Sequence, residues 1–280
     1  MVITVQEFLA LCEPDQGPML LGVVGNPISH TRSPRIQSLF AREAKLNMDY
    51  VAIQAADPAE VHRLLEATQT VSRCRGFNLT IPFKEVLLSY HPDSLTIRIG
   101  AGNTVVKRNN RWESTNTDWQ GFLAPLSGRT LRTACVLGWG GSARAVVYAL
   151  QSVGCQVTVI SRRDCQIPGI PVLQSDYESP MIGFSTPDLI VNTTPVGMAG
   201  TGSTFNPDFL YSLGKPVLAY DLIYRPAVTP FLEHFRSVGS ETVNGAPMLV
   251  GQAASAFYHW FGIQPSVEVC QQAISDLIDG

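Results

Sequence analysis

The feature that most constrains this 280-residue chain is a glycine-rich turn between a predicted strand and a predicted helix. Residues 133–137 form an apolar segment of strand length, and a helical pattern runs from the turn to about Val153. Gly138, Gly140 and Ala143 occupy the fixed positions of the pattern G-x-G-x-x-(G/A). Glycines at these positions permit a tight turn and let a pyrophosphate approach the backbone, and the N-terminus of the helix stabilises its charge. The turn predicts a Rossmann-type unit whose cofactor contacts include Gly138, Gly140, Gly141, Ser142 and Ala143.

The next predicted strand, residues 156–160, ends in Ser161, Arg162 and Arg163. A carboxylate at this point would bind the ribose 2′-hydroxyl of NAD, whereas arginine pairs with the 2′-phosphate of NADP. The two arginines therefore favour NADP. The alternatives are that both are solvated loop residues, or that Asp164 shifts the preference towards NAD.

Strands and helices continue to alternate through the second half of the chain. We predict strands over residues 188–192 and 216–221, and helices over residues 230–238, 250–261 and 266–278. Residues 193–198 (T-T-P-V-G-M) follow one of these strands, and their small side chains would line a cofactor crevice. An ordinary loop has the same composition.

The first half of the chain has the same alternation and predicts a second, mainly parallel α/β sheet. The expected strands are 19–25, 50–54 and 76–81, the expected helices are 5–12, 35–45 and 58–67, and Asn109-Asn110 would join a hairpin of residues 102–106 and 111–115. Ser33 precedes Pro34, the usual sequence of a helix N-cap. The alternative role for Ser33, together with Thr31, is to bind a carboxylate at the helix N-terminus.

The stretch from Gly76 to Glu85 places a lysine just beyond a strand. Alternating apolar residues indicate a strand that Pro82 must end, because proline has no N–H to donate. Lys84 follows, and residues 85–90 resemble a helix. Ligands of α/β sheets bind at this edge, where a lysine can exchange a proton with a substrate oxygen. Asp118 similarly follows the hairpin. The alternatives are a solvated Lys84 and an Asp118 that only caps the next helix.

Composition excludes several classes of protein. Hydrophobic residues make up 45% of the chain and charged residues 15%, as in a well-buried globular protein large enough for two domains. The net charge of −3 without a basic cluster argues against a nucleic-acid partner, and no apolar run is long enough to span a membrane. The N-terminus lacks a signal-peptide pattern, and the six cysteines are scattered without a C-x-x-C pair. We therefore expect a cytoplasmic protein with reduced thiols and no metal site.

Eight short segments, in order along nearly the whole chain, resemble the shikimate dehydrogenase family. They are G-N-P-I-S-H-T-R-S-P (25–34), N-L-T-I-P-F-K (78–84), G-A-G-N-T (100–104), N-T-D (116–118), G-W-G-G-S-A-R (138–144), N-T-T-P-V-G-M (192–198), Y-D-L-I-Y-R-P (220–226) and M-L-V-G-Q-A (248–253). The resemblance implies a substrate domain of residues 1–117 plus 246–280 and an NADP-binding Rossmann-like domain of residues 118–245. It also implies reversible, NADPH-dependent reduction of 3-dehydroshikimate to shikimate, a step of aromatic amino-acid biosynthesis, by a monomer or homodimer.

The resemblance also assigns residues to the site. Lys84 and Asp118 would be the catalytic pair. The carboxylate of the substrate would contact Thr31, Ser33 and Tyr224, its hydroxyls would contact Thr80, Asn103 and Gln252, and the cofactor would also contact Thr193, Met198 and Gly245. This chain departs from the family pattern at Thr31 (usually serine), Gln37 (usually histidine) and Gln166 (often arginine). Two alternatives are a quinate/shikimate dehydrogenase that prefers NAD and a cofactor-sensing protein without turnover.

Overall fold

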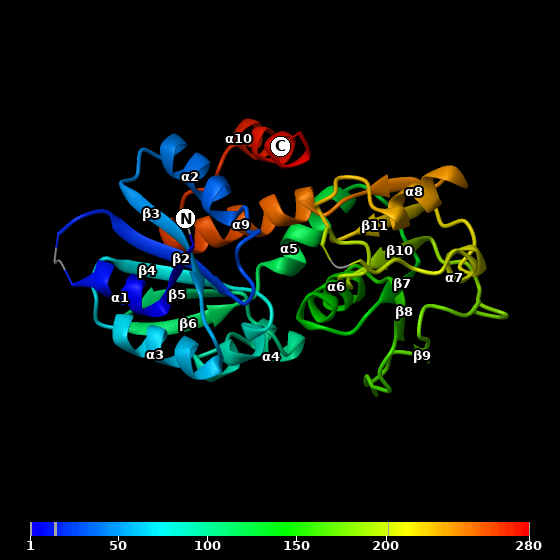
Figure 1. Ribbon diagram of the computed structural model, residues 1–280, viewed down its shortest axis with the longest axis horizontal. Helices are drawn as coiled ribbons and strands as arrows, with labels where there is room; N and C mark the ends of the chain where they lie inside the picture. The colour runs from blue at the N-terminus through cyan, green and yellow to red at the C-terminus, as the bar shows by residue number, and fades with distance from the viewer. Residues whose placement is uncertain (1, 14–15, 201, 280) are drawn as a thin grey trace. The chain divides into compact units, whose positions relative to one another are not determined.

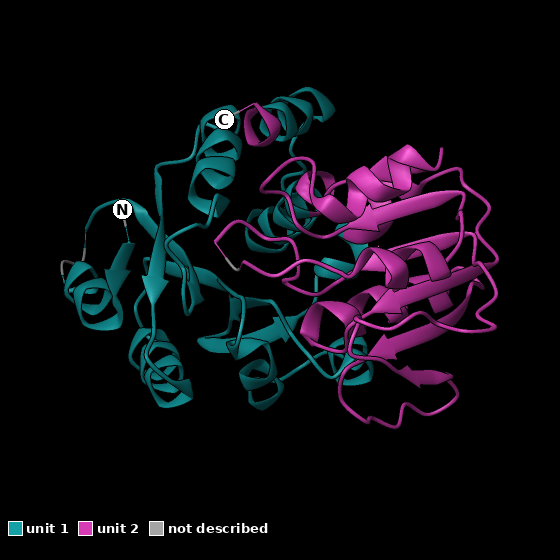
Figure 2. Ribbon diagram, turned by 45° about the vertical axis from the view of Figure 1, so that its right-hand side comes forward, with its two compact units in different colours: residues 1–121, 249–275 teal, residues 122–248, 276–280 magenta. Residues whose placement is uncertain are grey.

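The computed structural model describes residues 2–13, 16–200 and 202–279. The chain divides into two compact units, which Figure 2 distinguishes by colour. Unit 1 comprises residues 1–121 and 249–275, and unit 2 comprises residues 122–248 and 276–280. The assignment of residues 1–117 plus 246–280 to substrate and of residues 118–245 to cofactor stays a prediction.

A six-stranded sheet in the order β1-β3-β2-β4-β5-β6 forms the centre of unit 1. Its strands are β1 (Val2–Thr4), β2 (Met19–Gly25), β3 (Met48–Gln54), β4 (Cys74–Leu79), β5 (Thr104–Arg108) and β6 (Arg111–Thr115). The first four run parallel, and β5 pairs antiparallel with β4 and with β6. Asn109 and Asn110 make the turn between β5 and β6 with φ of 50° and 56°, which confirms the predicted hairpin.

The apolar run of β2 is buried on both faces of this sheet, as a central parallel strand requires. Leu20 and Val24 pack with residues of α1 (Val5–Cys12) and α3 (Pro58–Thr68). Leu21 and Val23 point to the opposite face, where Ala256 and Trp260 of α9 (Ala246–Phe261) cover them. Figure 1 shows α9 and α2 (Ser33–Glu43) on one side of the sheet and α1 and α3 on the other. The remaining helices of this part are η1 (Phe83–Ser89, a 3₁₀ helix), α4 (Ser94–Ile99), α5 (Asp118–Leu123) and α10 (Val267–Ile278).

Unit 2 contains a second six-stranded sheet in the order β12-β11-β10-β7-β8-β9, with every pair parallel. Its strands are β7 (Thr133–Leu137), β8 (Gln156–Ser161), β9 (Val172–Gln174), β10 (Leu189–Asn192), β11 (Leu218–Asp221) and β12 (Glu241–Val243), and its helices are η2 (Ala124–Leu126), α6 (Gly141–Ser152), α7 (Pro207–Ser212) and α8 (Pro230–Ser237). Counted from β7, this is the order 3-2-1-4-5-6 of dinucleotide-binding folds. The Rossmann-type prediction for this region is confirmed.

Two local predictions and one alternative differ from the structure. Ser33 does not cap α2: Arg32 is the N-cap, and Ser33 is the first helical residue. The strand that begins near Gly76 ends at Leu79 instead of Ile81, and the helix after it is a 3₁₀ helix that already includes Lys84. Asp118 does not cap a helix with its side chain, which instead binds Lys84 and Asn103.

Candidate active site

The sheet of unit 1 gathers its polar side chains at one edge. Strands β2, β4 and β6 run in the same direction, so the segments that follow them lie at the same edge of the sheet. Strand β5 runs the other way and therefore begins at that edge. This topology brings Lys84 (after β4), Asn103 (before β5) and Asp118 (after β6) together from distant parts of the sequence.

Lys84 and Asp118 form a buried ion pair. The Lys84 Nζ atom lies 2.6 Å from the Asp118 Oδ2 atom, and the two side chains are only 11% and 7% exposed. A buried charge pair of this kind persists when geometry and further hydrogen bonds offset the cost of removing both ions from water. The ion pair therefore fixes the position of Lys84 Nζ beside a carboxylate.

Asn103 fixes the carboxylate of Asp118 from the other side. Its Nδ2 atom donates to Asp118 Oδ1 at 2.8 Å and lies 3.3 Å from Gln252 Oε1. Its Oδ1 atom accepts a hydrogen bond from the backbone N–H of Thr117 at 2.7 Å. Asn103, Gln252 and Asp118 are all buried. Four residues assigned from the sequence therefore form one hydrogen-bonded cluster: Lys84, Asn103, Asp118 and Gln252.

Two further residues, which support this cluster, were not among the predicted site residues. Asn116 accepts from the backbone N–H of Asp118 at 3.0 Å and donates to the carbonyl of Ala101 at 2.7 Å. Thr117 is fully buried, and its hydroxyl lies 3.0 Å from Asn103 Nδ2. Both lie in the N-T-D segment, so their position next to Asp118 was the only sequence signal. They orient the carboxylate and would not themselves need to touch a ligand.

Thr31, Ser33 and Thr80 lie on segments that follow neighbouring strands β2 and β4. The hydroxyls of Thr31 and Ser33 are 3.3 Å apart, and Thr31 Oγ1 accepts from the backbone N–H of Ser33. Thr80 begins the turn that leads to Lys84, and its backbone N–H binds the carbonyl of Val24 at 2.9 Å. These three hydroxyls therefore belong to the same sheet edge as Lys84. Tyr224 belongs to unit 2, so its contact with the same substrate stays a prediction.

The glycine-rich turn of unit 2 has the geometry that a pyrophosphate requires. Gly138 directly follows β7 and has φ of +97°, a conformation that residues with a side chain disfavour. A Cβ atom there would lie 2.8 Å from Thr194 and 3.0 Å from the hydroxyl of Thr193, which follow β10. Strands β7 and β10 flank the point where the strand order reverses, the usual binding crevice of such sheets. Gly140 precedes α6, and a Cβ atom on it would meet nothing within 4 Å.

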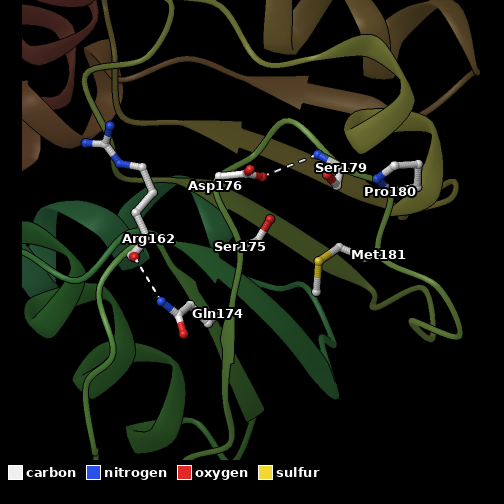
Figure 3. Close-up of a pocket in the computed structure, with 7 residues that line it drawn as sticks. All are labelled: Arg162, Gln174, Ser175, Asp176, Ser179, Pro180 and Met181. Atoms are coloured by element: carbon white, nitrogen blue, oxygen red, sulfur yellow. Dashed lines mark hydrogen bonds between the residues drawn. The ribbon is translucent and has the colours of Figure 1, made fainter.

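The loop after β8 forms one wall of a pocket. Its volume is about 440 Å³, and it is lined by Arg162, Gln174, Ser175, Asp176, Ser179, Pro180 and Met181. The carbonyl of Arg162 accepts from Gln174 at 3.5 Å, and the guanidinium extends away from Asp176 (Figure 3). The Asp176 carboxylate accepts the backbone N–H of Ser179 at 3.3 Å. Ser161 is buried and its hydroxyl binds the N–H of Arg163, so Ser161 shapes the loop while Arg162 is one of the residues that line the pocket.

A buried carboxylate joins two loops at the carboxyl edge of the second sheet. Asp221 accepts hydrogen bonds from Asn192 Nδ2 at 3.0 Å, from the N–H of Ile223 at 3.0 Å and from the Thr229 hydroxyl at 2.5 Å. Burial raises the pKa of Asp221 to about 7, although these three hydrogen bonds act in the opposite direction. Asp221 thereby connects the loop that carries Thr193 with the loop that carries Tyr224.

The last two cofactor residues assigned from the sequence lie near these loops. Met198 is 45% exposed. Gly245 donates its N–H to the carbonyl of Ile223 at 3.0 Å, and a Cβ atom at this position would collide with the carbonyl of Leu222. Glycine is required at position 245 by this close backbone approach.

Within residues 2–13, 16–200 and 202–279, no group of three or more His, Cys, Asp or Glu side chains is placed to hold a metal ion. The helices in this described part of the chain are all too short or too polar to cross a membrane.

Comparisons with known proteins decide the family. Residues 23–105 match the model of the shikimate dehydrogenase substrate binding domain, and residues 245–274 match that of the shikimate 5'-dehydrogenase C-terminal domain. The chain is 38% identical over 268 residues to a shikimate dehydrogenase (NADP(+)) of Thermosynechococcus vestitus, covering 88% of this chain and 91% of the relative. The chain belongs to the shikimate dehydrogenase family. A family member of Exiguobacterium is 35% identical and covers 93% of this chain and 100% of its own.

Solved structures of family members share the fold. The shikimate dehydrogenase of Aquifex aeolicus superposes with a TM-score of 0.80 at 32% identity, covering 92% of this chain and 97% of its own. The Thermus thermophilus enzyme, solved in complex with NADP(H) and shikimate, gives a TM-score of 0.78 at 31% identity, covering 92% and 99%. The predicted α/β fold with a Rossmann-type unit is thereby confirmed.

Proposed function

We propose that this protein is an NADP-dependent shikimate dehydrogenase that reversibly reduces 3-dehydroshikimate to shikimate. The observation that carries the proposal is the buried Lys84–Asp118 pair at the sheet edge where ligands of α/β proteins bind. Relatives that carry this activity in their names match about nine-tenths of the chain. One structural neighbour was solved with both NADP(H) and shikimate.

In the proposed mechanism Lys84 acts as the general acid and base. NADPH, when bound, supplies a hydride to the carbonyl carbon of the substrate. Lys84 Nζ donates a proton to the carbonyl oxygen, and it takes the proton back from the hydroxyl in the reverse direction. Asp118 holds Nζ in place at 2.6 Å, and Asn103 holds the carboxylate at 2.8 Å. The protein contributes mainly orientation and proton transfer.

The residues of unit 2 fit a dinucleotide that carries a 2′-phosphate. The positive φ of Gly138 and the open space at Gly140 leave the backbone accessible to a pyrophosphate at the N-terminus of α6. Arg162 follows β8 directly and lines the adjoining pocket, and this is the position at which arginine pairs with the additional phosphate. Thr193 and Gly245 line the loops around this crevice. These features support NADP over NAD.

Substrate recognition is proposed to combine a carboxylate site with hydroxyl contacts. Thr31 and Ser33 present neighbouring hydroxyls at the start of α2 and would bind the carboxylate together with Tyr224. Thr80, Asn103 and Gln252 would bind the ring hydroxyls. The methyl group of Thr31 occupies space beside the carboxylate that a serine would leave open, so this residue is proposed to influence the choice between shikimate and quinate.

Rates with both acids and both cofactors test the proposal. We expect kcat/KM to be highest for shikimate with NADP. Faster oxidation of quinate with NAD would replace the proposal by a quinate/shikimate dehydrogenase. Absence of turnover with all four combinations, together with measurable cofactor binding, would favour the cofactor-sensing alternative.

A Lys84→Ala variant tests the assigned proton donor. We expect turnover to fall at least ~100-fold while shikimate binding, measured by calorimetry, is largely kept. Lys215→Ala is the matched control, because Lys215 is an exposed lysine of unit 2. Unchanged turnover in Lys84→Ala would remove this residue from the mechanism.

Three further properties are part of the proposal. Residues 1–117 plus 246–280 would bind substrate and residues 118–245 the cofactor. The enzyme would act in the cytoplasm, as a monomer or homodimer. Light scattering during gel filtration measures the oligomeric state, and a mass above that of a dimer would contradict it.

A further inference from the structure

Two cysteines that are far apart in the sequence lie side by side in unit 1. Cys12 is the last residue of α1 and Cys74 is the first residue of β4, and their Sγ atoms are 3.4 Å apart. Both are free thiols. Bonded sulfurs are about 2.0 Å apart, so a disulfide needs an approach of only about 1.4 Å. Cys12 is only partly buried, so its side chain has more room for this movement than that of Cys74.

The two thiols have different environments. Cys74 is completely buried, whereas Cys12 is partly exposed and can meet a small reagent. The hydrogen bond with Cys74 lowers the pKa of Cys12, and the positive charges of Arg73 and Lys107 add to this effect. The same hydrogen bond and burial raise the pKa of Cys74. Cys12 is therefore the thiol that forms a thiolate first, and Cys74 is placed to resolve an adduct on it.

The two cations are held beside the cysteines by backbone carbonyls. The Arg73 guanidinium binds the carbonyls of Pro18 and Leu11 at 3.1 and 3.4 Å, and Leu11 is the neighbour of Cys12. The Lys107 ammonium donates to the carbonyls of Thr68 and Val71 at 2.7 and 2.5 Å. Positive charge near the pair is thus a fixed part of the fold.

We propose that Cys12 and Cys74 are a reversible oxidation site, which closes to a disulfide by exchange with a low-molecular-weight disulfide. The Cys12 thiolate attacks one sulfur of the reagent, forms a mixed disulfide and releases one thiolate. That thiolate takes the proton of Cys74, whose sulfur then attacks the Cys12 sulfur and releases the second half of the reagent as a thiolate. This second thiolate takes up from water the proton that Cys12 lost when it ionised. Two cysteine thiols are oxidised, and one external disulfide is reduced to two thiols.

The bond would reinforce contacts that already exist. Phe8 of α1 packs edge-on against Phe77 of β4 with ring centroids 5.3 Å apart. The helix and the strand are therefore already packed against each other before any oxidation. A disulfide between them would close a chain segment from residue 12 to residue 74 and restrict the unfolded chain. We expect it to raise the melting temperature by about 5 °C or more. Lys84 follows the opposite end of β4, so turnover should change less than twofold.

The test uses the full chain and glutathione disulfide. Under denaturing conditions the number of titratable thiols should fall from six to four after oxidation. Mass spectrometry of a non-reduced digest should find the peptides of Cys12 and Cys74 linked, and dithiothreitol should restore both the thiols and the original melting temperature. Cys12→Ser should abolish the link and the temperature shift. The control Cys270→Ser, which removes another partly exposed thiol, should keep both.

Other outcomes would overturn the proposal. They are six remaining thiols, a glutathione adduct on Cys12 that Cys74 does not displace, or a linked pair that includes any other cysteine. A link accompanied by a lower melting temperature would also contradict it, because the bond would then distort the fold. These readouts do not involve dehydrogenase activity, so they are independent of the proposed function.

Discussion

The Lys84–Asp118 pair makes a quantitative prediction about stability. Its side chains are 11% and 7% exposed and its charged atoms are 2.6 Å apart. Asp118→Asn keeps the shape of the side chain but leaves a buried ammonium without its carboxylate, and such losses cost about 3–5 kcal/mol. Lys84→Met leaves a buried carboxylate and should cost a similar amount, reduced slightly because Asn103 still donates to it.

The double variant Lys84→Met/Asp118→Asn should be less destabilised than the sum of the two single variants. Replacing both members of a buried pair by neutral groups is often close to neutral, so the coupling energy of the cycle should be about 3 kcal/mol. Urea unfolding measures it through the fluorescence of Trp112 and Trp260, which are both buried in unit 1.

An exposed ion pair of the same unit provides the control. Arg108 and Glu113 are 3.5 Å apart, and their side chains are 55% and 47% exposed. The cycle of Arg108→Met and Glu113→Gln should give at most about 0.5 kcal/mol. If the Lys84–Asp118 cycle gave a value as small as this control, the two groups would not be paired in a water-poor site, and the reasoning would be refuted.

Three other substitutions test separate parts of the structure. Arg162→Gln should raise KM for NADPH about tenfold or more and leave KM for NADH within about twofold, because only NADPH carries the 2′-phosphate. An equal change for both cofactors would contradict the assignment of Arg162 to this phosphate. Asp221 has a pKa of about 7 in the folded protein, against an ordinary value of 3.8. As pH rises from about 4 to 7, the unfolded chain therefore loses this proton while the folded protein keeps it. This difference lowers the free energy of unfolding by roughly 4 kcal/mol at most. The stability of wild type relative to Asp221→Asn should therefore fall across that range, and a constant difference would argue against a protonated Asp221. Gly76→Ala would place a Cβ atom against the Trp260 indole and 2.5 Å from the carbonyl of Val105, and should cost about 2–4 kcal/mol in urea unfolding; an unchanged stability would contradict this close packing.

The sequence predicted the central strands, because a strand that is buried on both faces has a continuous run of apolar residues. The bounds of β2 (Met19–Gly25) and β7 (Thr133–Leu137) match the prediction, because a central parallel strand is apolar on both faces. Strand β9 (Val172–Gln174) was missed because it has three residues and pairs only with β8. So short an edge strand carries no periodic signal.

The prediction that Ser33 caps a helix was wrong for a local reason. Serine before proline is typical of an N-cap, but the N–H groups of Arg35 and Ile36 both bind the carbonyl of Arg32, so the helix begins one residue earlier. The Thr31 hydroxyl accepts the N–H of Ser33, and no side chain caps the helix. A serine before a proline does not show at which residue the helical backbone begins.

The meeting of Lys84 and Asp118 was predicted by the family resemblance, and their ion pair is present in the structure. The supporting contacts of Asn116 and Thr117 were not predicted. They depend on side chains that bind backbone groups of other segments, such as the carbonyl of Ala101. Contacts of this kind need the tertiary structure, because neither hydrophobic periodicity nor turn composition records them.

Unit 1 is completed by a part of the chain that is made well after its sheet. Trp260 of α9 donates to the carbonyl of Val105, and Gln37 donates to the carbonyl of Ala253, so residues after position 248 complete, together with α2, the cover of the sheet face behind β2 and β3 (Figure 1). During synthesis, residues 122–248 leave the ribosome before that cover exists. The cofactor-type fold can therefore form on the nascent chain while apolar residues of the first sheet still await their helix, and this interval is when the protein would most need a chaperone.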